Sequence, residues 1–203
     1  MNLEFGLISL VILVFSAILH EVAHGYVADR LGDPTARLLG RLTLNPIPHI
    51  DLYMSIILPL LLIFVGSPII FGGAKPVPVD PFNLRDGRRD LAIVSLAGPL
   101  TNFIIAIFFA LLIHAIPAHF LSAFSYTIML LVVRLNLLLG IFNLFPIPPL
   151  DGSKVFSLLL PEREAASFIN LGNVGFILVF GFLYLFSGIL ISLLDFSLRL
   201  LGL

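Results

Sequence analysis

The stretch Ala17-Ile18-Leu19-His20-Glu21-Val22-Ala23-His24-Gly25 places two imidazoles and a carboxylate inside a long apolar segment. On an α-helix, His20 and His24 lie one turn apart on the same face, where their ring nitrogens can bind one zinc ion. Glu21 lies beside them and stays free to take a proton from water at an open coordination position. The pattern indicates a metal-dependent hydrolase, although membrane histidines and glutamates also serve as structural groups or as steps in a proton path.

The composition places this stretch in a lipid bilayer. Apolar residues make up 59% of the 203 residues and charged residues only 11%, and the mean hydropathy is +1.12. These values are typical of a polytopic membrane protein. The net charge is −1 and the chain has no basic stripe, so we expect no nucleic-acid partner. Because the chain has no cysteine, a metal must bind histidines and carboxylates.

Four apolar runs are long enough to cross about 30 Å of hydrocarbon as helices. They cover residues 3–28, 91–115, 126–145 and 171–194. A further run over residues 52–71 contains Pro59 and Gly66-Ser67-Pro68, which would let it either span the membrane or enter and return. We therefore predict an all-α polytopic membrane protein with about five to six transmembrane or re-entrant helices, forming a single transmembrane domain over residues 1–203.

Two segments between the first spans are expected to be extended. Residues 38–44 resemble a short strand, because Asn45-Pro46-Ile47-Pro48 prevents a helix after them. The alternating prolines of Lys75-Pro76-Val77-Pro78-Val79 are typical of an edge strand. Together they predict a small membrane-associated β element, in which an edge such as residues 38–44 would be open to pairing with a further extended segment.

A catalytic zinc usually has three protein ligands, so a third is needed beside the two histidines. No glutamate occurs between Glu21 and Glu162. Asp151 follows a proline-broken helix end inside an apolar stretch, which favours it as the third ligand. Asp51 and His49, at the border of the second apolar run, remain alternative ligands. The aspartates of polar loops, which we expect to be solvated, are Asp29, Asp33, Asp80, Asp86 and Asp90.

Three motifs occur in order along the chain. They are His20-Glu21-Val22-Ala23-His24, Ser95-Leu96-Ala97-Gly98-Pro99-Leu100-Thr101-Asn102 and Asn143-x-x-Pro146-x-Pro148-x-Leu150-Asp151-Gly152. Together they resemble the site-2 protease family of intramembrane zinc metalloproteases. The segments Arg41-Leu42-Thr43-Leu44-Asn45-Pro46 and Phe71-Gly72-Gly73-Ala74-Lys75-Pro76-Val77-Pro78 look like those of its small members, which lack PDZ and CBS domains.

The resemblance implies a role for each residue of the site. His20, His24 and Asp151 would bind one Zn²⁺ per chain, Glu21 would be the catalytic base, and Asn143 would help to hold the substrate or the developing oxyanion. The implied activity is that of a zinc metalloendopeptidase cutting peptide bonds within or near the transmembrane segments of membrane proteins. We expect Asn102 and Asn136 to line a water path to the site. A membrane transporter or proton relay, and a non-catalytic membrane scaffold, remain alternatives.

The topology follows from the requirement that His24 and Asp151 meet. If residues 52–71 crossed the membrane fully, the two side chains would lie on opposite faces, so we predict that this run is re-entrant. All basic residues of the connecting loops then lie on one side, which the positive-inside rule makes cytoplasmic. They are Arg30, Arg37, Arg41, Lys75, Arg85, Arg88, Arg89, Lys154 and Arg163. We expect a multi-pass protein of a prokaryotic plasma membrane, with its active site toward the cytoplasm and both termini outside.

Overall fold

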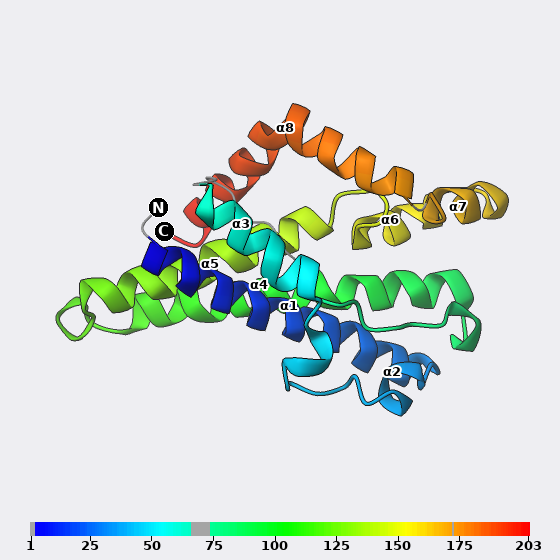
Figure 1. The fold of residues 1–203 in the computed structure, drawn as a ribbon, viewed down its shortest axis with the longest axis horizontal. Coiled ribbons are helices and arrows are strands. Elements are labelled where there is room, and N and C mark those ends of the chain that lie inside the picture. Colours follow the sequence, from blue (N-terminus) through cyan, green and yellow to red (C-terminus); the bar gives the residue numbers. More distant parts are fainter. Residues whose placement is uncertain (1–2, 66–73, 172) are drawn as a thin grey trace.

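Four long helices form the frame of the protein in a computed structural model, which describes residues 3–65, 74–171 and 173–203. These four helices, each long and apolar enough to cross a membrane, are α1 (Leu3–Leu31), α4 (Gly87–Ala115), α5 (Ala123–Asn143) and α8 (Asn173–Leu200). The short helices between them are α2 (Thr35–Leu38), α3 (Leu58–Phe64), α6 (Asp151–Phe156) and α7 (Glu162–Ile169) (Figure 1). The predicted helical multi-pass architecture is confirmed, because each predicted span coincides with one of the four long helices.

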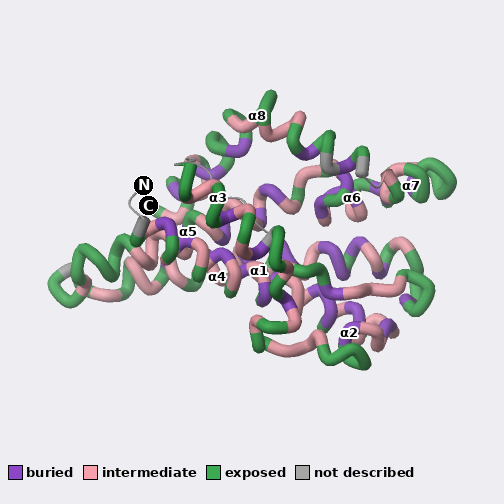
Figure 2. Tube along the Cα trace, in the orientation of Figure 1, coloured by how far each residue is buried: buried purple, intermediate pink, exposed green. Residues whose placement is uncertain are grey.

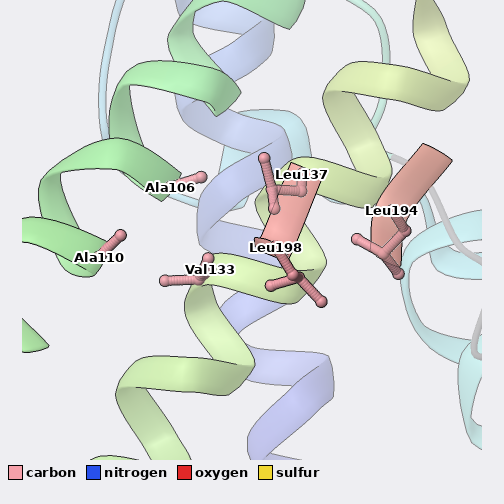
Figure 3. Close-up of a cluster of buried hydrophobic side chains, with 6 residues drawn as sticks. All are labelled: Ala106, Ala110, Val133, Leu137, Leu194 and Leu198. Atoms are coloured by element: carbon pink, nitrogen blue, oxygen red, sulfur yellow. The ribbon is translucent and has the colours of Figure 1, made fainter. Parts of the chain in front are cut away.

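Helices α1, α4 and α5 run side by side through the centre of the molecule, and α8 arches over α5 (Figure 1). A cluster of small and branched apolar side chains joins α4, α5 and α8 (Figure 3). Its members are Ala106, Ala110, Val133, Leu137, Leu194 and Leu198. The two alanines bring the backbone of α4 close to α5, which is how small residues stabilise helix pairs in a membrane.

The outer faces of the long helices are apolar and exposed (Figure 2). On α4 the exposed residues recur at helical spacing as Leu100, Ile104, Phe108 and Leu111. A soluble protein rarely leaves so much apolar surface in contact with water. On a membrane span these side chains meet lipid, so the burial pattern agrees with the composition.

The connection between α1 and α4 returns to the end of α1 from which it starts. The backbone N–H of Arg85 donates to the carbonyl of Leu31 at 3.2 Å. His20 contacts Asn102 whereas His24 contacts Val94, so α1 and α4 are antiparallel neighbours. Residues 32–86 therefore begin and end at the same end of the helix pair.

The buried side chain of Asp33 stabilises this connection through hydrogen bonds. Its side chain is fully buried and accepts hydrogen bonds from the backbone N–H of Asp80 (2.7 Å), the Asn83 amide (3.1 Å), and the backbone N–H (3.1 Å) and hydroxyl of Thr35. Burial raises the pKa of the Asp33 carboxyl, but these hydrogen bonds outweigh it and bring the pKa below its usual value. The expectation of solvated loop aspartates is wrong for Asp33, and also for Asp90, which is 6% exposed.

The predicted β element is wrong, because neither proposed segment forms a strand within the described residues. Residues 38–41 instead complete the end of α2, where Gly40 has a φ of 65°. The N–H of Gly40 donates to Arg37 O at 3.0 Å and that of Arg41 to Ala36 O at 2.8 Å. This Schellman motif uses the backbone groups that a strand would need. Residues 74–80 have no regular secondary structure, and the N–H groups of Lys75, Val77 and Asp80 bind a loop carbonyl and two side chains rather than a neighbouring strand.

The second apolar run begins with a π-helical turn over Leu52–Ile57 and continues as α3, which ends at Phe64. Pro59 lies in the first turn of α3, where a missing N–H removes no helical hydrogen bond. The remainder of the run, including Gly66-Ser67-Pro68, lies outside the described residues. The described helical part of the run is 6 plus 7 residues long.

Candidate metal centre

Two imidazoles of α1 meet a carboxylate at the start of α6. Oδ2 of Asp151 lies 3.1 Å from Nε2 of His20 and 3.2 Å from Nε2 of His24. In the described part of the chain these three residues form the one group of three or more His, Cys, Asp or Glu side chains whose ligand atoms lie within 4.8 Å of one another. His49 and Asp51, the alternative ligands, are not in this group; Nε2 of His49 is bound by Thr43 O at 2.9 Å. The structure therefore brings together the three residues favoured by the sequence.

The second ring nitrogen of each histidine is hydrogen-bonded to an oxygen of α4. Nδ1 of His20 lies 2.6 Å from Oδ1 of Asn102, and Nδ1 of His24 lies 2.7 Å from the carbonyl of Val94. These oxygens accept, so Nδ1 donates in both rings and each neutral Nε2 carries a lone pair. Two lone pairs and the Asp151 carboxylate then face a common point, which favours a cation there.

The spacing of these atoms suits zinc. Four ligands at about 2.0–2.1 Å around a tetrahedral zinc ion lie about 3.3–3.4 Å from one another. The observed separations of 3.1 and 3.2 Å from Asp151 Oδ2 to the two Nε2 atoms are close to this. Nitrogen and carboxylate oxygen are ligands that zinc accepts in proteins. The donor set and its spacing therefore fit one zinc ion.

A stripe on α4 lies against both imidazole rings, with Val94 and Asn102 at the Nδ1 atoms and Gly98 at the Nε2 atoms. Val94, Gly98 and Asn102 recur every four residues and so share one face of the helix. A Cβ on Gly98 would lie 2.4 Å from Nε2 of His20 and 2.5 Å from Nε2 of His24. The bare backbone at Gly98 is therefore required for the rings to lie where they do. Sequence reasoning named the Gly98 motif but missed this role, although the four-residue spacing was a usable signal.

Asp151 is held in place by the close approach of α6 to the end of α5. A Cβ on Gly152 would lie 2.1 Å from the carbonyl oxygen of Leu144. Only glycine fits this contact, which brings the first turn of α6 against the backbone that follows α5. The sequence Asp151-Gly152 thus combines a ligand with the residue that lets it reach α1.

Lys154 contacts the carboxylate oxygen that faces away from the histidines. Its Nζ lies 3.4 Å from Oδ1 of Asp151 and 3.0 Å from the carbonyl of Pro149. Burial raises the pKa of the Asp151 carboxyl, but the two imidazoles and the Lys154 ammonium beside it lower the pKa well below its usual range. Asp151 is therefore an ionised carboxylate with Oδ2 directed at the imidazoles.

Glu21 is separate from the three-residue group. Its Oε2 accepts a hydrogen bond from the backbone N–H of Val77 at 2.7 Å. Val77 lies between Pro76 and Pro78, which have no N–H, so it supplies the one donor of this three-residue stretch. The contact orients the Glu21 carboxylate, and no described residue donates a hydrogen bond to its second oxygen, Oε1. Sequence reasoning placed residues 75–79 in an edge strand and did not find this contact.

The three asparagines singled out from the sequence have different surroundings. Asn143 is the last residue of α5, is partly buried, and donates to Leu139 O in its own helix at 3.0 Å. Asn102 and Asn136 are fully buried and hydrogen-bonded to each other at 3.0 Å. The expectation that Asn102 and Asn136 line a path open to water is therefore wrong in this structure.

Comparisons with known proteins give the family. The model of peptidase family M50 matches residues 8–132 and 118–186. The chain is 41% identical over 180 residues to "Putative zinc metalloprotease YwhC" of Bacillus subtilis, a match that covers 86% of this chain and 77% of the relative. It is 37% identical over 143 residues to "Putative zinc metalloprotease Rip2" of Mycolicibacterium smegmatis, covering 68% of this chain and 52% of the relative.

A more distant archaeal relative extends the comparison. "Zinc metalloprotease MJ0392" of Methanocaldococcus jannaschii is 26% identical over 162 residues, covering 80% of this chain and 37% of that protein. No solved structure matches the chain significantly. Because the family model covers most of the chain and YwhC is 41% identical over most of its length, the chain belongs to peptidase family M50, the site-2 proteases, and is a zinc metalloprotease of the membrane.

Proposed function

We propose that this protease cuts peptide bonds in transmembrane segments of other membrane proteins, with His20, His24 and Asp151 as the zinc ligands. The observation that carries the proposal is the meeting of the two Nε2 lone pairs with Oδ2 of Asp151 between membrane-spanning helices. The transporter and scaffold alternatives are not favoured, because neither accounts for the match to a peptidase family.

Each of the remaining site residues has a chemical task. A zinc ion held by the three ligands supplies Lewis-acid polarisation of the scissile carbonyl and of a water molecule. Glu21, oriented by the Val77 N–H at 2.7 Å, takes the proton of the attacking water on Oε1 and later donates it to the leaving amine. Lys154 holds Oδ1 of Asp151 and so leaves Oδ2 as the metal-facing atom.

Asn143 is proposed to hold the substrate or the oxyanion that develops on the scissile carbonyl. One hydrogen of its Nδ2 is used by Leu139 O. Among the described residues the other hydrogen has no acceptor, so it can serve as a donor to a substrate. Such donors stabilise the charge that appears in the transition state of acyl transfer. Asn143 also lies eight residues before Asp151, at the end of α5 nearest the ligand.

The substrate must unwind before it can be cut, because the carbonyls of a transmembrane helix are engaged in helical hydrogen bonds. We expect a model substrate with a Pro or Gly pair near the scissile bond to be cleaved faster than a uniformly Leu-rich segment of the same length. Cleavage rates measured in proteoliposomes by mass spectrometry of the products would test this. Equal cleavage of soluble folded proteins would contradict the proposal.

The second apolar run is proposed to be re-entrant. Its described helical part has 6 plus 7 residues, which span about 20 Å, whereas the hydrocarbon layer is about 30 Å thick. The hydrogen bond between Arg85 and Leu31 supports this, because residues 32–86 then start and finish on one side of the membrane. The basic loops share that side, which is therefore proposed to be the cytoplasmic face of a prokaryotic cell membrane.

Cysteine labelling tests the topology, and the chain has no cysteine of its own to interfere. Single Cys substitutions are placed at the exposed residues Arg37, Arg89, Ser122 and Glu164. With an impermeant thiol reagent added outside the cells, we expect labelling of Ser122→Cys alone, with all four variants labelled after permeabilisation. Labelling of Arg89→Cys from outside would contradict the re-entrant arrangement.

A further inference from the structure

A chain of polar side chains runs from the middle of α1 through α5 and α4 back to the candidate metal centre. Asn136 Nδ2 donates to Ser16 Oγ at 3.0 Å, and Asn102 Nδ2 donates to Asn136 Oδ1 at 3.0 Å. His20 Nδ1 completes it with its contact of 2.6 Å to Asn102 Oδ1. All four side chains are buried. Burying polar side chains inside a membrane costs free energy, so such side chains usually serve a function.

Each amide of this chain has one workable orientation. Asn136 Nδ2 also donates to the carbonyl of Val132 at 2.9 Å, so its nitrogen must face Ser16 and Val132 and its oxygen must face Asn102. Asn102 must then direct Nδ2 at Asn136 and Oδ1 at His20. An acceptor beside Nδ1 places the ring proton there. Nε2 of His20 is left with its lone pair toward Asp151.

We propose that Asn102, itself held by Asn136, is a positioning residue that selects the tautomer and ring orientation with which His20 binds zinc. The inference rests on the proposed function, in which His20 is a zinc ligand. His24 needs no such chain, because the Val94 carbonyl is already fixed within α4. Removing the hydrogen-bond partner of a metal-bound histidine typically lowers metal affinity by about 10- to 100-fold.

A purely structural role makes a different prediction. If the amides served only to join α1, α4 and α5, their removal would lower the stability of the bundle and leave the zinc affinity of the folded protein unchanged. Zinc affinity and unfolding temperature must therefore be measured separately on the same full-length variants. The unfolding temperature is taken from metal-free protein, so that zinc binding does not contribute to it.

The experiment measures zinc affinity by competition with a chelator, and the visible spectrum of the Co²⁺-loaded protein. We expect Asn102→Leu to weaken zinc binding by about 10- to 100-fold and to change the cobalt spectrum. Asn136→Leu, one step further from the metal, should have a smaller effect of the same kind. Thr101→Val is the control on α4, since the Thr101 hydroxyl binds the carbonyl of Ala97 in its own helix, and it should keep wild-type affinity.

Asn102→Asp retains an acceptor for His20 Nδ1 and is expected to keep more zinc affinity than Asn102→Leu. If Asn102→Leu does not fold, Asn102→Asp decides alone, and loss of its zinc overturns the proposal. Wild-type affinity in folded Asn102→Leu, or equal losses in both variants, also overturns it. His20→Ala distinguishes the ligand assignment from the positioning role. Full zinc binding in His20→Ala would overturn the assignment of His20 as a ligand. Loss of zinc binding in His20→Ala together with wild-type zinc affinity in Asn102→Leu would overturn only the positioning role of Asn102.

Discussion

Glu21→Gln is expected to keep one zinc per chain and to lose cleavage by about 10²- to 10⁴-fold, the usual contribution of a general base. The glutamine has nearly the shape of the glutamate, and its amide oxygen can still accept the Val77 N–H that now binds Oε2 at 2.7 Å. It has no basic oxygen with which to take a proton from water. Zinc content by elemental mass spectrometry and cleavage of a transmembrane substrate in proteoliposomes measure the two properties independently.

The matched controls separate the base from the ligands. Glu164→Gln makes the same chemical change at an exposed position of α7, and should alter neither property. Asp151→Ala removes a proposed ligand, and should lower zinc occupancy together with cleavage. Cleavage by Glu21→Gln at the wild-type rate would refute the role of Glu21 as general base. Full zinc occupancy in Asp151→Ala would refute the assignment of Asp151 as a zinc ligand.

The parts of the site that were predictable from the sequence depend on spacing along one helix or on a break in one. The four-residue separation of His20 and His24 places both rings on one face of α1, whatever the rest of the chain does. Asp151 was favoured because a carboxylate beside a broken helix in an apolar stretch is costly to bury unless a cation or another polar group pairs with it. Hydropathy gave the four spans for the same reason, since a span is a local property of about 20 residues.

The parts that were missed depend on contacts between distant segments. Val77 reaches Glu21 across 56 positions, and Asp33 is buried because residues 80–83 fold back over it. Residues 38–44 have a strand-like sequence, but Gly40 allows a Schellman motif that uses the N–H groups of Gly40 and Arg41. A propensity for extended structure yields a strand only where a neighbouring strand is available, and the sequence does not state which segment will be the neighbour.

Gly98→Ala is expected to lower zinc affinity although it replaces a poor helix former by the best one. Alanine is favoured over glycine inside a helix by about 1 kcal/mol, so α4 itself should not be weakened. The added carbon would, however, lie 2.4 Å from Nε2 of His20 and 2.5 Å from Nε2 of His24, whereas unstrained contacts are about 3.5–4 Å. At least one ring must leave its place to make room for the methyl group. Overpacking of this kind costs about 1–3 kcal/mol, which corresponds to an affinity loss of about 5- to 150-fold.

The control for Gly98→Ala is Gly181→Ala in α8, where the added carbon meets no atom within 4 Å. Both changes make the same substitution inside a long helix, so a general effect on helix stability appears in both. Zinc affinity by chelator competition should fall in Gly98→Ala and stay at the wild-type value in Gly181→Ala. Wild-type zinc affinity in Gly98→Ala would mean that α4 lies further from the two imidazoles than the structure shows. Steric contact with the imidazoles would then not explain the glycine between Val94 and Asn102.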